Sequence, residues 1–149
     1  MSLRPDQPVA RVMSWPVATI DHDATLAEAA EALAADSIGA LLVLRDSGLV
    51  GIISERDLVI HVAAGSDLSH LLTGEVMSGD LVTVQSDAPI VAAARAMVEA
   101  DVRHLPVMEG QLIAGVVSVR DVVAVLAVAV SDEDVMVVPS GTRVVVGPR

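Results

Sequence analysis

Two short segments, Ser54-Glu55-Arg56-Asp57 and Ser118-Val119-Arg120-Asp121, carry the residue types in this chain best suited to bind a ligand. An ionised Asp accepts two hydrogen bonds at once, which suits a pair of neighbouring hydroxyl groups. Arg offers a planar fork for phosphate oxygens. Each Ser stands where a strand-like apolar run gives way to a helical pattern, and free N–H groups at a helix start favour an anion. These residue types fit a ligand with a diol and an anionic group.

The same Ser-x-x-Asp spacing also fits a helix capping box, in which Ser caps the helix and the acid reaches back to a backbone N–H. That interpretation needs no ligand, and the two roles are compatible in one residue pair. Arg56 and Arg120 have a similar alternative, because both fit a solvated position in the first helical turn.

The two segments belong to an internal repeat with an offset of 64 residues. Residues 9–60 and 73–124 align without a gap and share 16 identities in 52 positions, including Val12-Met13-Ser14 with Val76-Met77-Ser78. Self-similarity of this kind indicates a duplicated structural unit. We predict repeat 1 at 9–64 and repeat 2 at 73–130, with an N-terminal segment at 1–8, a linker at 65–72 and a C-terminal tail at 131–149.

Each unit is expected to form a strand, a helix, two strands and a second helix. Apolar residues recur at helical spacing in the Ala-rich stretches, and the strand runs are separated by turn residues. A unit of about 50 residues is too small to be stable alone, so we predict an α/β (α+β) fold of two tandem β-α-β-β-α units packed as a pseudo-two-fold pair. The expected strands are 17–20, 40–44 and 50–53, then 81–84, 105–108 and 113–117; the second helices are 56–64 and 120–129; a terminal hairpin is expected beyond 134, after a solvated acidic helix end at 131–134.

Two copies of Gly-aliphatic-aliphatic-Ser-x-Arg-Asp in this order of elements resemble a cystathionine β-synthase (CBS) domain pair, or Bateman module. The resemblance covers roughly residues 9–128 and implies a stand-alone regulatory module in signal transduction. It implies an adenosine-containing ligand (AMP, ADP, ATP or S-adenosylmethionine) in the clefts between the units, with no other cofactor. It also implies a homodimer formed through helical faces, which the small Ala and Val side chains would permit.

The resemblance also assigns roles to residues. Asp57 and Asp121 are expected on ribose, and Ser54, Arg56, Ser118 and Arg120 near phosphate. Each cleft is expected to combine this segment from one unit with the loop after the first helix of the other unit. Those loops are Ile38, Gly39 and Ala40 in repeat 1, and Val102, Arg103, His104 and Leu105 in repeat 2.

Repeat 1 departs from the common family pattern, since Leu42 stands where repeat 2 has Pro106, and Gly39-Ala40 replaces Arg103-His104. We expect the cleft built on the repeat 1 loop to lack those basic groups. This leaves a second hypothesis, a ligand-free module that acts through an effector protein. His104 itself has two interpretations, a ligand contact or a local hydrogen bond.

Charge and composition argue against several other classes of function. The 149 residues carry a formal charge of −11, with nine Arg, no Lys and twenty acids, whereas nucleic-acid binding needs a basic surface. No cysteine is present, so disulfides are excluded. The longest apolar run, 122–130, is about half of what a membrane span requires, and no secretory signal opens the chain. We expect a cytoplasmic protein.

Nothing in the sequence predicts catalysis. It has no Cys nucleophile, no Lys, no Gly-x-Ser-x-Gly and no P-loop. His22, His61 and His70 share no metal-ligand spacing, and Asp21-His22-Asp23 fits a turn. We therefore expect a protein that is not an enzyme and has no metal site.

Overall fold

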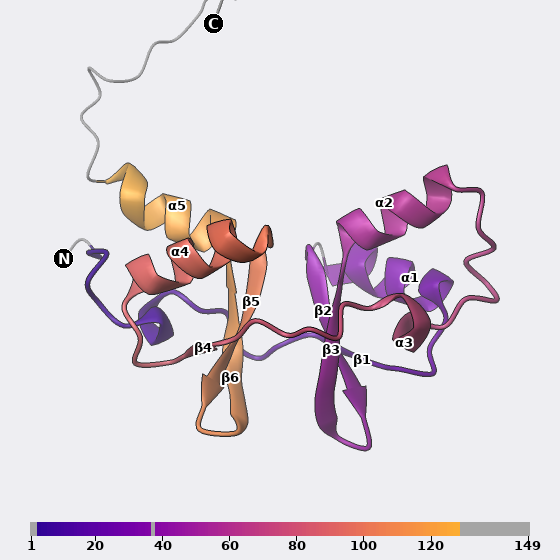
Figure 1. Cartoon of the computed structure of the whole chain (residues 1–149), viewed down its shortest axis with the longest axis horizontal. Helices are drawn as coiled ribbons and strands as arrows, with labels where there is room; N and C mark the ends of the chain where they lie inside the picture. The colour runs from indigo at the N-terminus through magenta and orange to yellow at the C-terminus, as the bar shows by residue number, and fades with distance from the viewer. Residues whose placement is uncertain (1–2, 37, 129–149) are drawn as a thin grey trace, which may run out of the picture.

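The computed structural model describes residues 3–36 and 38–128. The expected terminal hairpin and the acidic helix end at 131–134 lie outside the described residues. Two lobes lie side by side, each with its helices on the same side of the molecule (Figure 1). No helix among the described residues is both long and apolar enough to cross a bilayer.

Each repeat forms the predicted strand-helix-strand-strand-helix unit. The expected fold class is confirmed: an α+β chain with two three-stranded sheets, ordered β1-β2-β3 and β4-β5-β6. Repeat 1 contains β1 (Thr19–Asp21), α1 (Leu26–Asp36), β2 (Ala40–Arg45), β3 (Gly48–Ser54) and α2 (Glu55–Ala63). Repeat 2 contains β4 (Val84–Gln85), α4 (Ile90–Ala100), β5 (His104–Glu109), β6 (Leu112–Ser118) and α5 (Val119–Ala127), and α3 (Thr73–Val76) precedes it.

The 64-residue offset extends to strand register. β1 pairs with β2 in parallel, and β2 pairs with β3 antiparallel with Ala40 opposite Ser54. In the second sheet His104 lies opposite Ser118 in the same arrangement. Both hairpins shift register at matching places, after Val43 and after Val107. The ends of these strands set the start of the following helix, so the register places both Ser-x-x-Asp segments.

Each repeat has its own apolar core, built from residues that correspond between the units. Strand side chains such as Leu41 and Ile53 pack against Leu26 and Ala29 of α1, and Leu105 and Val117 do the same on α4. Alanines at 29 and 93 allow the helices to approach their sheets closely. Met13 and Met77, which correspond in the repeat, are partly buried against these two cores.

The first residues of each repeat pack on the other repeat. Val9 belongs to the core of repeat 2 and its N–H donates to Ala88 O at 2.8 Å, while Ser14 N donates to Val116 O at 2.8 Å. The start of repeat 2 does the same for repeat 1, where Thr73 N donates to Ala24 O at 2.7 Å. These exchanged segments tie the two lobes together (Figure 1).

Candidate ligand-binding site

A cavity of about 410 Å³ opens between the lobes, which we call cavity 1. Repeat 1 contributes the start of α2, and repeat 2 contributes the loop between α4 and β5. The volume lies in the range of about 300–1,000 Å³ typical of small-molecule sites. The residues expected at a site that line it are Ser54, Arg56, Asp57, Gly39, Val102, Arg103 and His104.

In a second cavity of about 820 Å³, cavity 2, the two repeats exchange their contributions. Repeat 2 contributes the start of α5, and repeat 1 contributes the loop between α1 and β2. Each cavity therefore combines the Ser-x-x-Asp segment of one unit with the loop of the other. The expected site residues that line cavity 2 are Ser118, Arg120, Asp121, Ile38, Gly39, Ala40, Arg103 and His104.

Asp57 and Asp121 form capping boxes at the starts of α2 and α5. Oδ2 of Asp121 accepts the N–H of Ser118 at 2.8 Å and its hydroxyl at 2.9 Å, and Asp57 Oδ2 accepts the same groups of Ser54 at 2.8 and 3.1 Å. Oγ of Ser118 accepts the N–H of Asp121 in return at 3.2 Å, whereas the matching contact at Ser54 falls short of hydrogen-bond geometry. The capping interpretation therefore holds for both segments.

The capping bonds leave room for a second role. They engage Oδ2 of each aspartate, and no residue in the described part of the chain donates a hydrogen bond to either Oδ1. Because the aspartates line cavities 1 and 2, a carboxylate oxygen at each site has capacity to accept a ligand hydroxyl.

The two motif arginines have different surroundings. Arg56 Nη1 lies 3.7 Å from Oδ2 of Asp101, which ends α4 in the left-handed conformation with φ +53°. Arg120 has no carboxylate within salt-bridge distance among residues 3–36 and 38–128. The cross-repeat pair is exposed and so contributes little to stability, but it places a carboxylate beside one arginine only.

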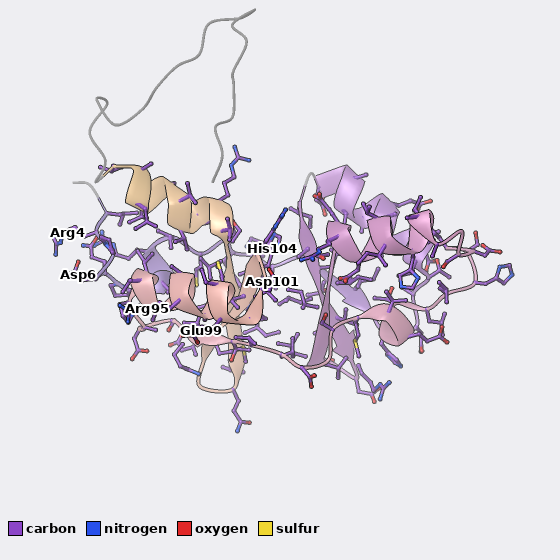
Figure 2. All side chains as sticks on the ribbon, turned by 45° about the horizontal axis from the view of Figure 1, so that its top comes forward. Arg4, Asp6, Arg95, Glu99, Asp101 and His104 are labelled. Atoms are coloured by element: carbon purple, nitrogen blue, oxygen red, sulfur yellow. The ribbon has the colours of Figure 1, made fainter. Side chains whose placement is uncertain are left out.

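His104 lies at the junction of the lobes, near Asp101 (Figure 2). Its imidazole packs directly on Gly39, where a Cβ would lie 2.8 Å from Nε2. Burial lowers the pKa of His104, while the charges of Glu55 and Asp121 act to raise this pKa and that of Arg103 to lower it. A neutral imidazole is therefore favoured at neutral pH.

Arg103 and His104 line both cavities. The expectation that the cleft on the repeat 1 loop lacks these basic groups was therefore wrong. Gly39 has no side chain, so the repeat 2 loop reaches across it and supplies both groups to cavity 2.

Leu105 differs from its predicted place at the site. It is fully buried in the core of repeat 2, because successive side chains of a strand point to opposite faces and His104 takes the face toward the cavities. The strand alternation could have excluded Leu105 from the sequence alone.

Sequence reasoning also missed several lining residues. The segments before β1 and β4 contribute Ser14 and Ala18 to cavity 2, and Ser78 and Val82 to cavity 1. The repeated Val-Met-Ser was the available signal. Four acidic lining residues were also missed, because Glu55 stands at the variable position of the motif and the others lie outside it: Asp36, Asp80 and Asp101.

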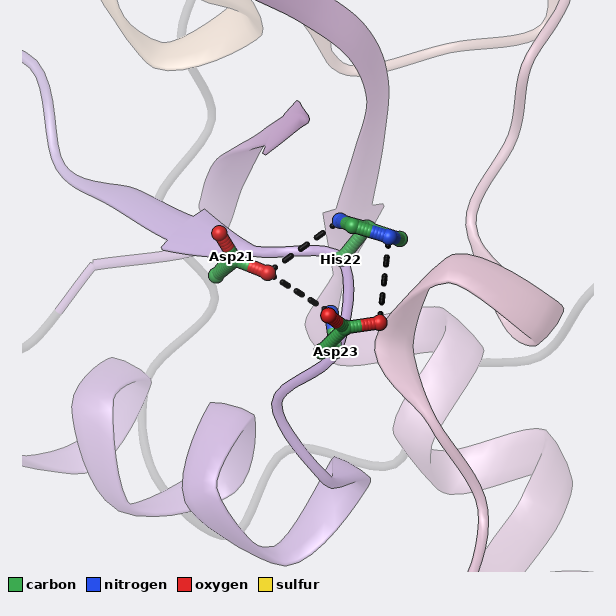
Figure 3. A group of neighbouring side chains, drawn as sticks. All are labelled: Asp21, His22 and Asp23. Atoms are coloured by element: carbon green, nitrogen blue, oxygen red, sulfur yellow. Dashed lines mark hydrogen bonds and ion pairs between the residues drawn. The ribbon is translucent and has the colours of Figure 1, made fainter. Parts of the chain in front are cut away.

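Asp21, His22 and Asp23 form a polar cluster that lines neither cavity (Figure 3). Their potential metal-ligand atoms lie within 4.8 Å of one another. His22 Nε2 lies 3.0 Å from Asp23 Oδ1, and Asp23 N donates to Asp21 Oδ1 at 2.9 Å. Nδ1 of His22 lies 3.1 Å from Asp21 Oδ1 in a geometry that makes no hydrogen bond. These contacts are those of the turn that the sequence predicts after β1.

The sequence model of the CBS domain matches residues 9–64 and again residues 73–128. This chain belongs to the CBS domain family. The tandem arrangement of the two matches makes it a CBS pair, as the repeat and its motifs predicted.

Known CBS proteins resemble the chain over most of its length. It is 27% identical over 113 residues to the CBS domain-containing protein YhcV of Bacillus subtilis, covering 76% of this chain and 81% of that protein. Other curated relatives are longer, and the chain spans 61% of one and 32% of another.

Solved CBS structures share the fold. The crystal structure of ATU1752 from Agrobacterium tumefaciens has a TM-score of 0.76 and 31% identity, over 81% of this chain and 94% of that one. The CBS pair of MJ0100, solved in complex with 5-methylthioadenosine and S-adenosyl-L-methionine, has a TM-score of 0.76 at 24% identity, over 84% of this chain and 99% of that one.

Proposed function

We propose that this CBS pair is a regulatory module that binds an adenosine-containing ligand between its repeats and is not an enzyme. The observation that supports it best is the composition of the two cavities. Each joins an aspartate with an available Oδ1 to a loop of the other repeat. A ligand that contacts both repeats at once binds one arrangement of the lobes more tightly than another and so stabilises it. Regulation requires this difference in affinity between two arrangements.

The proposed ligand class follows from the chemistry of the lining groups. A carboxylate oxygen suits a ribose diol, and the apolar side chains of Ile38, Ala40 and Val102 provide walls for a purine in a chain without Phe or Tyr. The CBS pair of MJ0100 supports the proposal, since it binds adenosine ligands on the same fold.

Thermal denaturation with AMP, ADP, ATP, S-adenosylmethionine and NAD tests this function. A ligand at 100 times its Kd stabilises the folded state by about 2.7 kcal/mol, which raises the Tm by several degrees. Asp57→Asn should remove the shift from a ligand in cavity 1, and Asp121→Asn from one in cavity 2. Asp87→Asn, outside both cavities, is the control. No shift with any of the five contradicts the proposal and favours a ligand-free interaction module.

We also propose that the module is a homodimer. Large apolar side chains are exposed on α2 and α5, which lie on the same side of the two lobes (Figure 1). The corresponding residues Val59 and Val123 are 65% and 54% exposed, and a second copy would remove such a surface from water. Sedimentation should show a dimer for the wild type and a monomer for Val59→Glu with Val123→Glu. A wild-type monomer at micromolar concentration contradicts this proposal.

A further inference from the structure

Residues that correspond by the 64-residue offset give the two cavities different charges. Asp80 of cavity 1 corresponds to Pro16 of cavity 2, and Asp101 corresponds to position 37, where the sequence has an uncharged Ser. Both cavities have two guanidinium groups. Cavity 1 has four carboxylates (Glu55, Asp57, Asp80 and Asp101), and cavity 2 has three (Asp36, Glu55 and Asp121).

The larger difference lies at the motif arginines. A phosphate at Arg56 would approach a guanidinium that Asp101 already faces at 3.7 Å. Opposite charges at this separation attract and like charges repel, and solvent reduces both effects at an exposed pair. A phosphate monoester carries a charge of about −1.5 to −2. Asp101 therefore weakens the attraction of Arg56 for such a group.

Arg120 presents the opposite case. No carboxylate of residues 3–36 or 38–128 lies within 4.0 Å of its guanidinium, and Arg103 lines the same cavity. Because Arg103 lines both cavities, the feature that distinguishes cavity 2 is a motif guanidinium that none of these carboxylates faces. A guanidinium binds phosphate oxygens through two parallel hydrogen bonds when no other anion occupies them.

Resting on the proposed function, we infer that the two cavities divide adenosine ligands by charge. Cavity 2 takes a ligand with a phosphate group, which Arg120 binds. Cavity 1 takes an adenosine ligand without phosphate, neutral or positively charged, and Asp101 is the residue that sets this preference. The motif is the same in both repeats, so the discrimination comes from residues outside it.

Calorimetric titration of AMP and adenosine into matched variants tests the inference. Arg120→Gln removes a charged hydrogen bond and should weaken AMP binding at least about tenfold, with adenosine affinity changed less than about twofold. Arg56→Gln should weaken AMP binding much less. Arg95→Gln on α4, which lines neither cavity, is the negative control. Equal losses of AMP affinity in Arg56→Gln and Arg120→Gln, or a larger loss in Arg56→Gln, overturn the inference.

The variant Asp101→Asn tests the inference in the opposite direction, through an expected gain in AMP affinity. Asn tolerates the left-handed backbone at this position, and the side chain is 89% exposed, so the variant should fold normally. It should strengthen AMP binding in cavity 1 and add a binding event that Arg56→Gln removes again. An AMP isotherm identical to wild type overturns the role of Asp101.

Failure of this inference is distinguishable from failure of the proposed function. If wild-type protein binds neither adenosine nor any of AMP, ADP, ATP, S-adenosylmethionine and NAD, the proposed function and the inference both fail. If these ligands bind but AMP affinity does not depend on Arg120, only the division by charge fails.

Discussion

The imidazole of His104 lies directly over Gly39, the residue that corresponds by the repeat to Arg103. An added Cβ at Gly39 would lie 2.8 Å from Nε2 and 3.0 Å from Cε1 of that ring. Only glycine leaves this space, so one loop carries the basic side chains and the other accommodates them. The two loops thus meet in a single asymmetric contact that belongs to both cavities.

Gly39→Ala should therefore force the His104 ring to move. The ring is the far end of a side chain, so we expect a loss of about 1 kcal/mol in unfolding free energy, at the low end for overpacking. Urea denaturation measures it. The double variant with His104→Ala should lose less than the sum of the two single losses. Additive losses contradict the contact.

The pH dependence of stability should report His104. Because burial lowers its pKa from the ordinary 6.5, the unfolded chain binds this proton more readily than the folded one. The unfolding free energy should therefore fall as the pH decreases below 6.5 toward the lowered pKa. Above pH 6.5 His104 is neutral in both states, so it should add no pH dependence there. Unfolding free energies between about pH 5 and pH 8 should have a smaller slope in His104→Gln. Equal slopes would show that His104 does not titrate differently on folding.

Gly115 is needed where the N-terminal segment crosses β6. A Cβ there would lie 2.7 Å from the backbone oxygen of Ser14, which is held by hydrogen bonding to Val116. Since backbone cannot rotate aside, Gly115→Ala should lower the unfolding free energy by about 2–3 kcal/mol. Gly79→Ala, where no atom lies within 4 Å, should stay within about 0.5 kcal/mol of wild type. Similar losses in both variants argue against this crossing.

The capping boxes predict unequal effects of one substitution. Ser118→Ala removes the hydroxyl oxygen that accepts the N–H of Asp121. It should lower the unfolding free energy by about 1 kcal/mol. Ser54→Ala should have a smaller effect, because the matching contact of Ser54 falls short of hydrogen-bond geometry. Chemical denaturation of the two variants compares them directly. A larger loss for Ser54→Ala would contradict the difference between the repeats.

Much of the fold was predictable because duplication shows the same pattern twice. Helices α2 and α5 each start within one residue of the expected position, because Ser54 and Ser118 end the preceding strands. The first strands are shorter and later than predicted, since only Thr19–Asp21 and Val84–Gln85 pair with a neighbour. The short helix Thr73–Val76 was missed, because four residues give no periodicity to detect.

The parts of the candidate site that occur in both repeats were predictable from the sequence. The contacts between the two repeats were not, because they depend on tertiary packing. The Ser-x-x-Asp segments and the loops were found through the repeat and the family resemblance. The Arg56–Asp101 pair joins residues 45 positions apart in different repeats, and no local pattern indicates such a contact. The reach of His104 over Gly39 likewise depends on how the lobes face each other.

The exchanged segments mean that a repeat as it is read along the chain differs from the unit that folds. Residues 3–14 complete the core of repeat 2, and the linker with Thr73 and Met77 completes that of repeat 1. Cleavage of the backbone between the repeats would leave each fragment holding the segment that covers the core of the other. The fragments could bury both cores only by reassociating, so the pair should melt in one cooperative transition and tolerate circular permutation better than division.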